Sequence, residues 1–199
     1  GRTELIDRQA VGELVPSLNL DPTGLPILAG LWHLDGATAR HDAVAWGYAK
    51  GATQRGVELH QLTEVTGVDI EAGRVTGVQT NRGKVSCGCV VQAVSGLSAD
   101  VSRMAGFPLP IVAYPLQAMV TQPVKPFLDP HVSSSALHCY VHQTSRGEIV
   151  IGGGSDPYPL YGTRSTLELK EGLIASAVEM FPFMSQMRLM RQWAGITDM

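Results

Sequence analysis

Four stretches of the chain have the spacing of hydrophobic and polar residues that is typical of helices. Asp7 is a good N-cap for the first stretch, and Pro16 follows its end. The second stretch contains no proline, repeats alanine and precedes Gly56, a typical C-terminal glycine. Gly106 and Pro182 follow the other two in the same way. The predicted helices are residues 8–14, 41–55, 98–105 and 165–180.

Elsewhere the hydrophobic residues alternate with polar ones, which is typical of strands. Glu71-Ala72-Gly73 and Asn81-Arg82-Gly83 are turn signals that join the first three such stretches into a predicted antiparallel meander. The pattern therefore predicts an α+β fold, in which a largely antiparallel sheet with flanking helices accompanies the meander. The predicted strands are residues 57–70, 74–80, 84–94, 111–121, 132–137, 139–144 and 148–151.

Composition narrows the functional class. The 199 residues are 44% hydrophobic and 17% charged, which is typical of a globular chain with a sizeable core. The net charge of −3 and the lack of a basic cluster argue against nucleic acid as a partner. No apolar stretch approaches the length of a membrane span, so we expect no membrane insertion and a cytoplasmic location. The three cysteines lack paired CxxC spacing and are expected to be reduced.

Two motifs in the second half of the chain are candidates for chemistry. The run Gly152-Gly153-Gly154-Ser155 precedes Asp156-Pro157 rather than a helix start, which argues against a phosphate-binding loop. His138, Tyr140 and His142 alternate along a predicted strand and would share one face. A metal site would need a third ligand and a carboxylate, so the pattern favours a pocket wall or a half-buried face, and we predict no metal.

His41 lies at the start of the predicted helix 41–55. The positive end of the helix dipole favours a neutral, nucleophilic imidazole, whereas the neighbouring Asp42 favours the charged form. Reasoning from these residues alone leaves both a structural and a chemical role open for His41.

Several separated stretches resemble one family. They are "GATARHDAVAWGYAKGATQRGVEL" (36–59), "MAGFPLPIVAYPLQAMVTQPVKP" (104–126), "HCYVHQTSRGEIVIGGGSDPY" (138–158) and "RQWAGITDM" (191–199). Together they are similar, in order and over nearly the whole chain, to the beta subunits of heterotetrameric sarcosine oxidases. These subunits are members of the D-amino-acid-oxidase-like flavoprotein family.

The resemblance implies cofactors, a substrate and a partner. It implies noncovalent FAD at the site of amine oxidation and FMN attached covalently through His41, with Arg40 and Asp42 beside it. Electrons would pass from sarcosine to FAD, then to FMN and then to oxygen, and an alpha subunit would be the partner. Two alternatives stay open: an FAD-only relative of glycine or D-amino-acid oxidases, in which His41 is structural, and a catalytically silent assembly module.

The resemblance also implies a site and a division of the chain. Tyr140 and His138 are expected to line the substrate pocket, where a neutral histidine would help to keep the amine deprotonated. Because the family's GxGxxG turn is absent from these residues, we expect an internal fragment that is inactive alone and prone to self-association. The expected parts are connecting helices with the flavin-linking loop (1–56), the meander and return strand of the FAD domain (57–106) and the substrate-binding domain (107–199).

Overall fold

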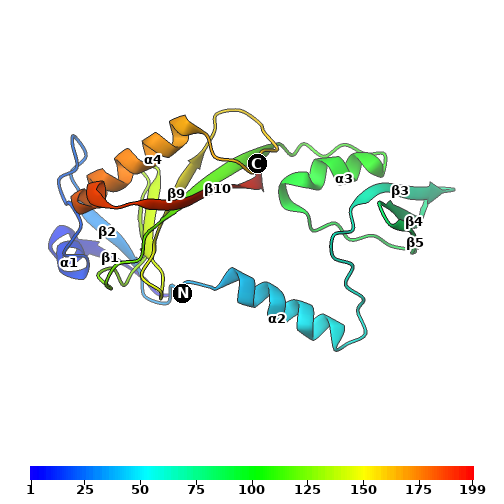
Figure 1. Cartoon of the computed structure of the whole chain (residues 1–199), viewed down its shortest axis with the longest axis horizontal. Coiled ribbons are helices and arrows are strands. Elements are labelled where there is room, and N and C mark those ends of the chain that lie inside the picture. Colours follow the sequence, from blue (N-terminus) through cyan, green and yellow to red (C-terminus); the bar gives the residue numbers. More distant parts are fainter. The chain divides into compact units, whose positions relative to one another are not determined.

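The computed structural model describes all 199 residues, which divide into two units (Figure 1). The first unit comprises residues 1–36 and 113–197 together with Met199. The second unit comprises residues 37–112 together with Asp198. No helix of the chain combines the length and the apolar character that crossing a membrane requires.

The first unit is built on a five-stranded sheet with the strand order β10-β6-β9-β8-β7, beside a two-stranded sheet of β1 and β2. The pairs β6–β9, β8–β9, β7–β8 and β1–β2 are all antiparallel. The strands are β1 (Thr3–Asp7), β2 (Ala29–His33), β6 (Ala113–Thr121), β7 (Val132–Ser134), β8 (Cys139–Gln143), β9 (Ile149–Ser155) and β10 (Leu189–Asp198). The helices are α1 (Arg8–Leu14), α4 (Leu167–Met180) and a 3-10 turn (Pro182–Gln186).

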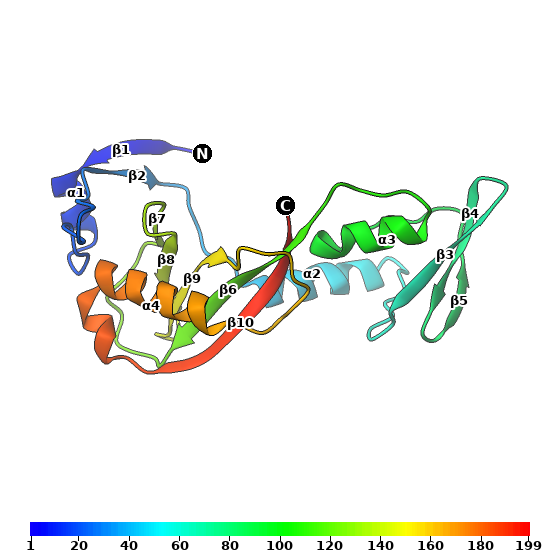
Figure 2. The same ribbon diagram turned by 90° about the horizontal axis from the view of Figure 1, so that it is seen from above.

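Helix α4 packs against one face of the five-stranded sheet and forms the core with it (Figure 2). Val141 and Ile149 of the sheet and Phe181 after the helix are completely buried in this core. Successive side chains of a strand point to opposite faces. Tyr140 and His142 therefore lie on the other face of β8, away from α4.

The second unit holds a three-stranded antiparallel sheet in the order β3-β4-β5. The β3–β4 turn uses left-handed backbone at Ala72 and Gly73, as the turn signal predicted. Helix α2 contains no buried residue. The elements are β3 (Val65–Glu71), β4 (Arg74–Thr80), β5 (Gly83–Ser86), α2 (His41–Thr53), a 3-10 turn (Ser95–Leu97) and α3 (Ser98–Met104).

The predicted α+β fold with antiparallel sheets is confirmed, and all four predicted helices are present. Four strand predictions are wrong in extent by three residues or more. The strand predicted over 57–70 begins only at Val65, because Leu62 has a positive φ of 54° that an extended strand does not allow. The strand predicted over 84–94 ends at Ser86, two residues before Gly88. The strand predicted over 132–137 ends at Ser134, where a turn over residues 135–138 begins. The strand predicted over 148–151 continues as β9 through the glycine run to Ser155.

Candidate functional site

We call the face of the five-stranded sheet that is turned away from α4 the open face. The ring of Tyr140 lies across this face, over strand β9. Tyr140 is paired with Gly152 in the β8–β9 register, and a Cβ atom at Gly152 would overlap the Tyr140 hydroxyl group. Glycine at this position therefore provides the space that the tyrosine ring occupies. A Cβ atom at Gly153, whose φ is 131°, would likewise overlap the carbonyl oxygen of His138. The chain's own atoms thus occupy the space beside Gly152 and Gly153.

Two histidine rings gather around Tyr140. The ring of His131 stacks on Tyr140 with centroids 5.2 Å apart and on His142 with centroids 5.6 Å apart. Tyr140 and His142 are themselves 6.2 Å apart and nearly parallel, at 18°. We call His131, Tyr140 and His142 the ring stack.

Sequence reasoning missed His131, because its place depends on the register of β7 and β8. Val132 pairs with Val141 in the antiparallel β7–β8 register, so the preceding residue, His131, falls opposite His142 on the same face. The predicted bounds of 132–137 and 139–144 leave only one residue between the strands and give a different register, so only the observed turn over residues 135–138 brings the two histidines together.

His138 lies outside the ring stack. The prediction that it shares a strand face with Tyr140 is wrong, because β8 begins at Cys139 and His138 occupies the preceding turn. Its φ of 47° is left-handed, as is common for the last residue of a tight connection between antiparallel strands. The His138 side chain is exposed.

The surroundings of the ring stack keep its groups uncharged near neutral pH. Burial lowers the pKa of His131, and burial together with the neighbouring His131 lowers the pKa of His142. Burial, followed by the nearby Cys139, raises the pKa of Tyr140. Nδ1 of His142 is buried without a hydrogen-bond partner. The stack therefore offers neutral imidazoles and a protonated hydroxyl group, which can donate a hydrogen bond to a carboxylate.

Gln117, Asp156 and Thr166 form a polar network at the same sheet, which the sequence analysis did not predict. Gln117 of β6 donates from Nε2 to Asp156 Oδ2 at 2.7 Å, and Thr166 donates from Oγ1 to Asp156 Oδ1 at 2.6 Å. The backbone N–H of Thr166, the N-cap of α4, donates to Gln117 Oε1 at 3.0 Å. These bonds tie the start of α4 to β6 and to the residue that follows β9.

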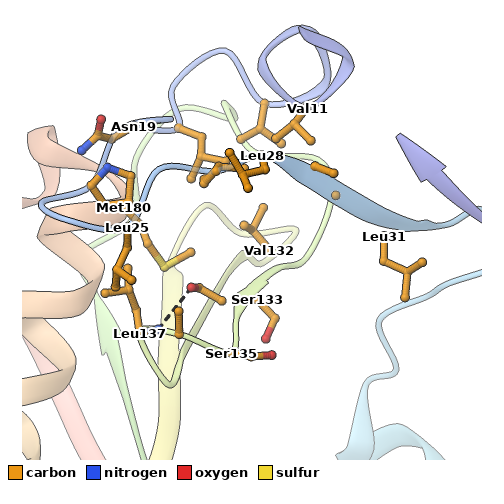
Figure 3. A pocket seen from close by; sticks show the side chains of 18 of the residues that line it. Val11, Asn19, Leu25, Leu28, Leu31, Val132, Ser133, Ser135, Leu137 and Met180 are labelled. Carbon is orange, nitrogen blue, oxygen red and sulfur yellow. Dashed lines mark hydrogen bonds between the residues drawn. The ribbon is translucent and has the colours of Figure 1, made fainter. Parts of the chain in front are cut away.

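A cavity of about 710 Å³ lies between the N-terminal segment and the β7–β8 connection (Figure 3). Val11, Leu25, Leu28, Val132 and Leu137 surround it. None of its lining residues is Asp, Glu, Lys or Arg. Its lining therefore offers no charged partner to the carboxylate of an amino acid, and it includes His131 of the ring stack.

The second region of interest is the first turn of α2. Arg40 is the N-cap, without a capping hydrogen bond from its side chain, and His41 is the first helical residue and is exposed. The carboxylate of Asp42 accepts from the N–H of Ala43 at 2.8 Å and pairs with Arg40 at 3.5 Å. The hydrogen bond from Ala43, then the charges of Arg40 and His41, lower the pKa of Asp42. The bonds of Asp42 thus go to Ala43 and Arg40, which leaves the imidazole of His41 open to solvent.

Comparison with known proteins assigns the chain to a family. Residues 1–199 match the sequence model of the family described as FAD dependent oxidoreductase. The chain belongs to this family. It is 45% identical over 197 residues to the sarcosine oxidase subunit beta of Rhodobacter capsulatus, covering 99% of this chain and 48% of that protein. It is also 45% identical to the same subunit of Rhizobium meliloti, covering 98% of this chain and 47% of that protein.

Solved structures agree with this assignment. The chain is similar to the crystal structure of L-proline dehydrogenase from P. horikoshii, with a TM-score of 0.89 and 30% identity over 98% of this chain and 52% of that one. Glycine oxidase from Geobacillus kaustophilus has the same fold, with a TM-score of 0.83 and 21% identity over 99% of this chain and 51% of that one. The chain spans about half the length of the curated relatives that it matches.

Proposed function

We propose that the protein containing this chain is the beta subunit of a hetero-oligomeric sarcosine oxidase that works with an alpha subunit. In this proposal FAD oxidises sarcosine or a closely related amino acid, and electrons pass to FMN and then to oxygen. The observation that carries the proposal is the 45% identity to a sarcosine oxidase beta subunit across 99% of the chain. Sarcosine and L-proline, named in two of the relatives, are both secondary amino acids, which supports a secondary amine as the substrate class.

The open face of the sheet suits such a substrate. FAD, when bound, supplies the two-electron acceptor for oxidation of the amine. The protonated hydroxyl group of Tyr140 can donate a hydrogen bond to the substrate carboxylate. A neutral histidine on this face can accept a proton from the substrate amine. His138 stays a proposed pocket residue at the edge of this face.

The first turn of α2 suits a covalent flavin. His41 is exposed and its neighbour Asp42 is engaged elsewhere, so a ring nitrogen of His41 is open to form a bond. Arg40 and Asp42 flank the position and would help to hold FMN there. A covalent bond from a ring nitrogen of His41 to the 8α-carbon would replace one C–H bond of the methyl group and the N–H bond of the imidazole, with two protons released and two electrons passed through the flavin to oxygen. This bond would fix the orientation of FMN, which would supply a second electron carrier.

The fate of the flavin on denaturation tests this proposal. The complete protein, produced with its alpha partner and precipitated with acid, should retain flavin in the pellet, and His41→Asn should abolish that retention. His60→Asn, at another exposed histidine of the same unit, is the matched control and should retain it. Complete release of flavin from the unmodified protein would indicate an FAD-only relative, and absence of flavin would indicate an assembly module. Mass spectrometry of the peptide around Arg40 should find the flavin mass on His41, and its presence on another residue would contradict the assignment.

Asp42→Ala should have a weaker effect than His41→Asn. The carboxylate supports the first turn of α2 through Ala43 and Arg40 and provides no atom of the proposed bond. Flavin retention should therefore decrease in Asp42→Ala without disappearing. Equal and complete loss in both variants would show that Asp42 takes part in forming the link.

The two proposed pocket residues are tested by kinetics. Tyr140→Phe should raise KM because the substrate carboxylate loses a hydrogen-bond donor, and His138→Asn should shift the pH profile of turnover. Turnover and pH profile that stay unchanged in both variants would remove Tyr140 and His138 from the site.

A further inference from the structure

Tyr140 can recognise a substrate only if its ring is held in one place. A tyrosine side chain on an open sheet face has two rotatable bonds and more than one staggered position. The open face has no helix above it comparable to α4 on the other side. Another part of the first unit must therefore limit where the hydroxyl group points.

Two contacts supply that limit from opposite sides. Below the ring, Gly152 leaves room for the hydroxyl group, which would overlap any Cβ atom at this position. Beside the ring, His131 stacks at 5.2 Å and also contacts His142, so its imidazole bridges the two side chains of β8. Aromatic contacts of this kind stabilise a particular ring orientation beyond what burial alone provides.

We propose that His131 and Gly152 are positioning residues for Tyr140, and that together they set the place of its hydroxyl group and hence the affinity for the substrate carboxylate. This inference rests on the proposed function, because it takes Tyr140 as the residue that contacts the substrate. His131 acts through Tyr140 in this arrangement and needs no contact with the substrate itself.

The first test observes the ring directly and needs no bound flavin. In protein labelled with 13C-tyrosine, the Tyr140 signals are assigned by their disappearance in Tyr140→Phe. Ring currents from His131 and His142 should displace these signals from the positions of an exposed tyrosine. His131→Ala should move them back toward those positions, and His131→Phe, which keeps an aromatic ring in the stack, should restore the displacement.

The second test measures substrate affinity in the complete protein. His131→Ala should raise KM about tenfold, the order expected for one misplaced hydrogen bond to a charged group, with little change in kcat. His131→Phe should return KM to near its original value. This rescue separates positioning by the ring from proton transfer, since phenylalanine cannot accept a proton.

Gly152→Ala provides an independent variant on the other side of the ring. Its new methyl group should displace Tyr140 and raise KM, whereas Gly195→Ala in β10, where a Cβ meets no atom within 4 Å, should not. If Tyr140 is already truncated in Tyr140→Ala, adding Gly152→Ala should cause no further rise in KM.

The outcomes separate this inference from the proposed function. Tyr140 signals that stay in place in both His131→Ala and Gly152→Ala would overturn the positioning role. A KM that rises in Tyr140→Phe but stays unchanged in His131→Ala and Gly152→Ala would overturn it as well, while leaving Tyr140 as a substrate contact. A KM unchanged in Tyr140→Phe would refute the role of Tyr140 itself and this inference with it.

Discussion

His131 and His142 both have a lowered pKa, which makes the stability of the folded chain depend on pH. Partial burial lowers the pKa of both rings below the value of 6.5 for a free histidine, since the charged form loses solvation. His142 is lowered further by its neighbour His131, because two adjacent imidazolium ions repel each other. Both histidines are therefore neutral in the folded state at a pH where unfolded histidines begin to bind protons.

This difference predicts that the folded state loses stability as the solution becomes acidic. Below about pH 6.5 the unfolded chain binds more protons at these two positions than the folded chain, so the free energy of unfolding decreases as pH falls through that range. Urea unfolding at about pH 7.5 and about pH 5.5 should show a smaller decrease for His131→Phe/His142→Phe than for the unmodified chain. His60→Phe, at an exposed histidine, is the control. Equal decreases in the double variant and the unmodified chain would contradict the prediction.

At the scale of elements, the network of Gln117, Asp156 and Thr166 joins three parts of the first unit that are distant in sequence. Gln117 and Asp156 are both only 3% exposed, so their polar groups depend on one another for hydrogen bonds. The network holds the N-terminus of α4 at the sheet, and α4 in turn covers the core face below Tyr140.

Removing the shared acceptor should destabilise this arrangement. Asp156→Ala removes the acceptor that Gln117 and Thr166 share and leaves them only the hydrogen bonds between each other, which should lower the free energy of unfolding by about 1–3 kcal/mol. Thr166→Ser retains the donating hydroxyl group and should cost much less. Urea unfolding followed by circular dichroism measures both. A loss in Asp156→Ala no larger than that in Thr166→Ser would show that the network does not support the fold.

At the scale of the whole molecule, the second unit has apolar side chains that no other part of that unit covers. Trp46 and Tyr48 of α2 are 64% and 79% exposed, and α2 has no buried residue at all. Helices in folded proteins usually bury one face, so a helix with such exposed aromatic residues is a surface ready for association.

The 199-residue chain, produced alone, should therefore self-associate in a concentration-dependent manner. Trp46→Ser and Tyr48→Ser should weaken this association because they remove apolar surface, whereas Lys50→Ser on the same helix removes none. Sedimentation velocity over a range of concentrations measures the effect. A strictly monomeric chain at every concentration would contradict the prediction.

Local signals were sufficient for much of the fold. The helices followed from Asp7, Gly56, Gly106 and Pro182, and β4 has the predicted bounds of Arg74–Thr80. Strands β1, β2 and β10 were not predicted. Strands β1 and β2 pair with each other across α1 and a long connection, and β10 joins β6 from the far end of the sequence. Pairings over such separations are not encoded in the local pattern of hydrophobic residues.

The sequence by itself determined the fold class, the helices, the meander turns and the position of His41 at a helix start, because these depend on neighbouring residues. The composition of the ring stack, by contrast, depends on the tertiary structure. The left-handed backbone of His138 removed that residue from the strand, and the β7–β8 register put His131 in contact with Tyr140 and His142. The role of Gly152 likewise depends on the tertiary structure. The β8–β9 register places Tyr140 next to Gly152, where only a residue without a side chain leaves room for the ring.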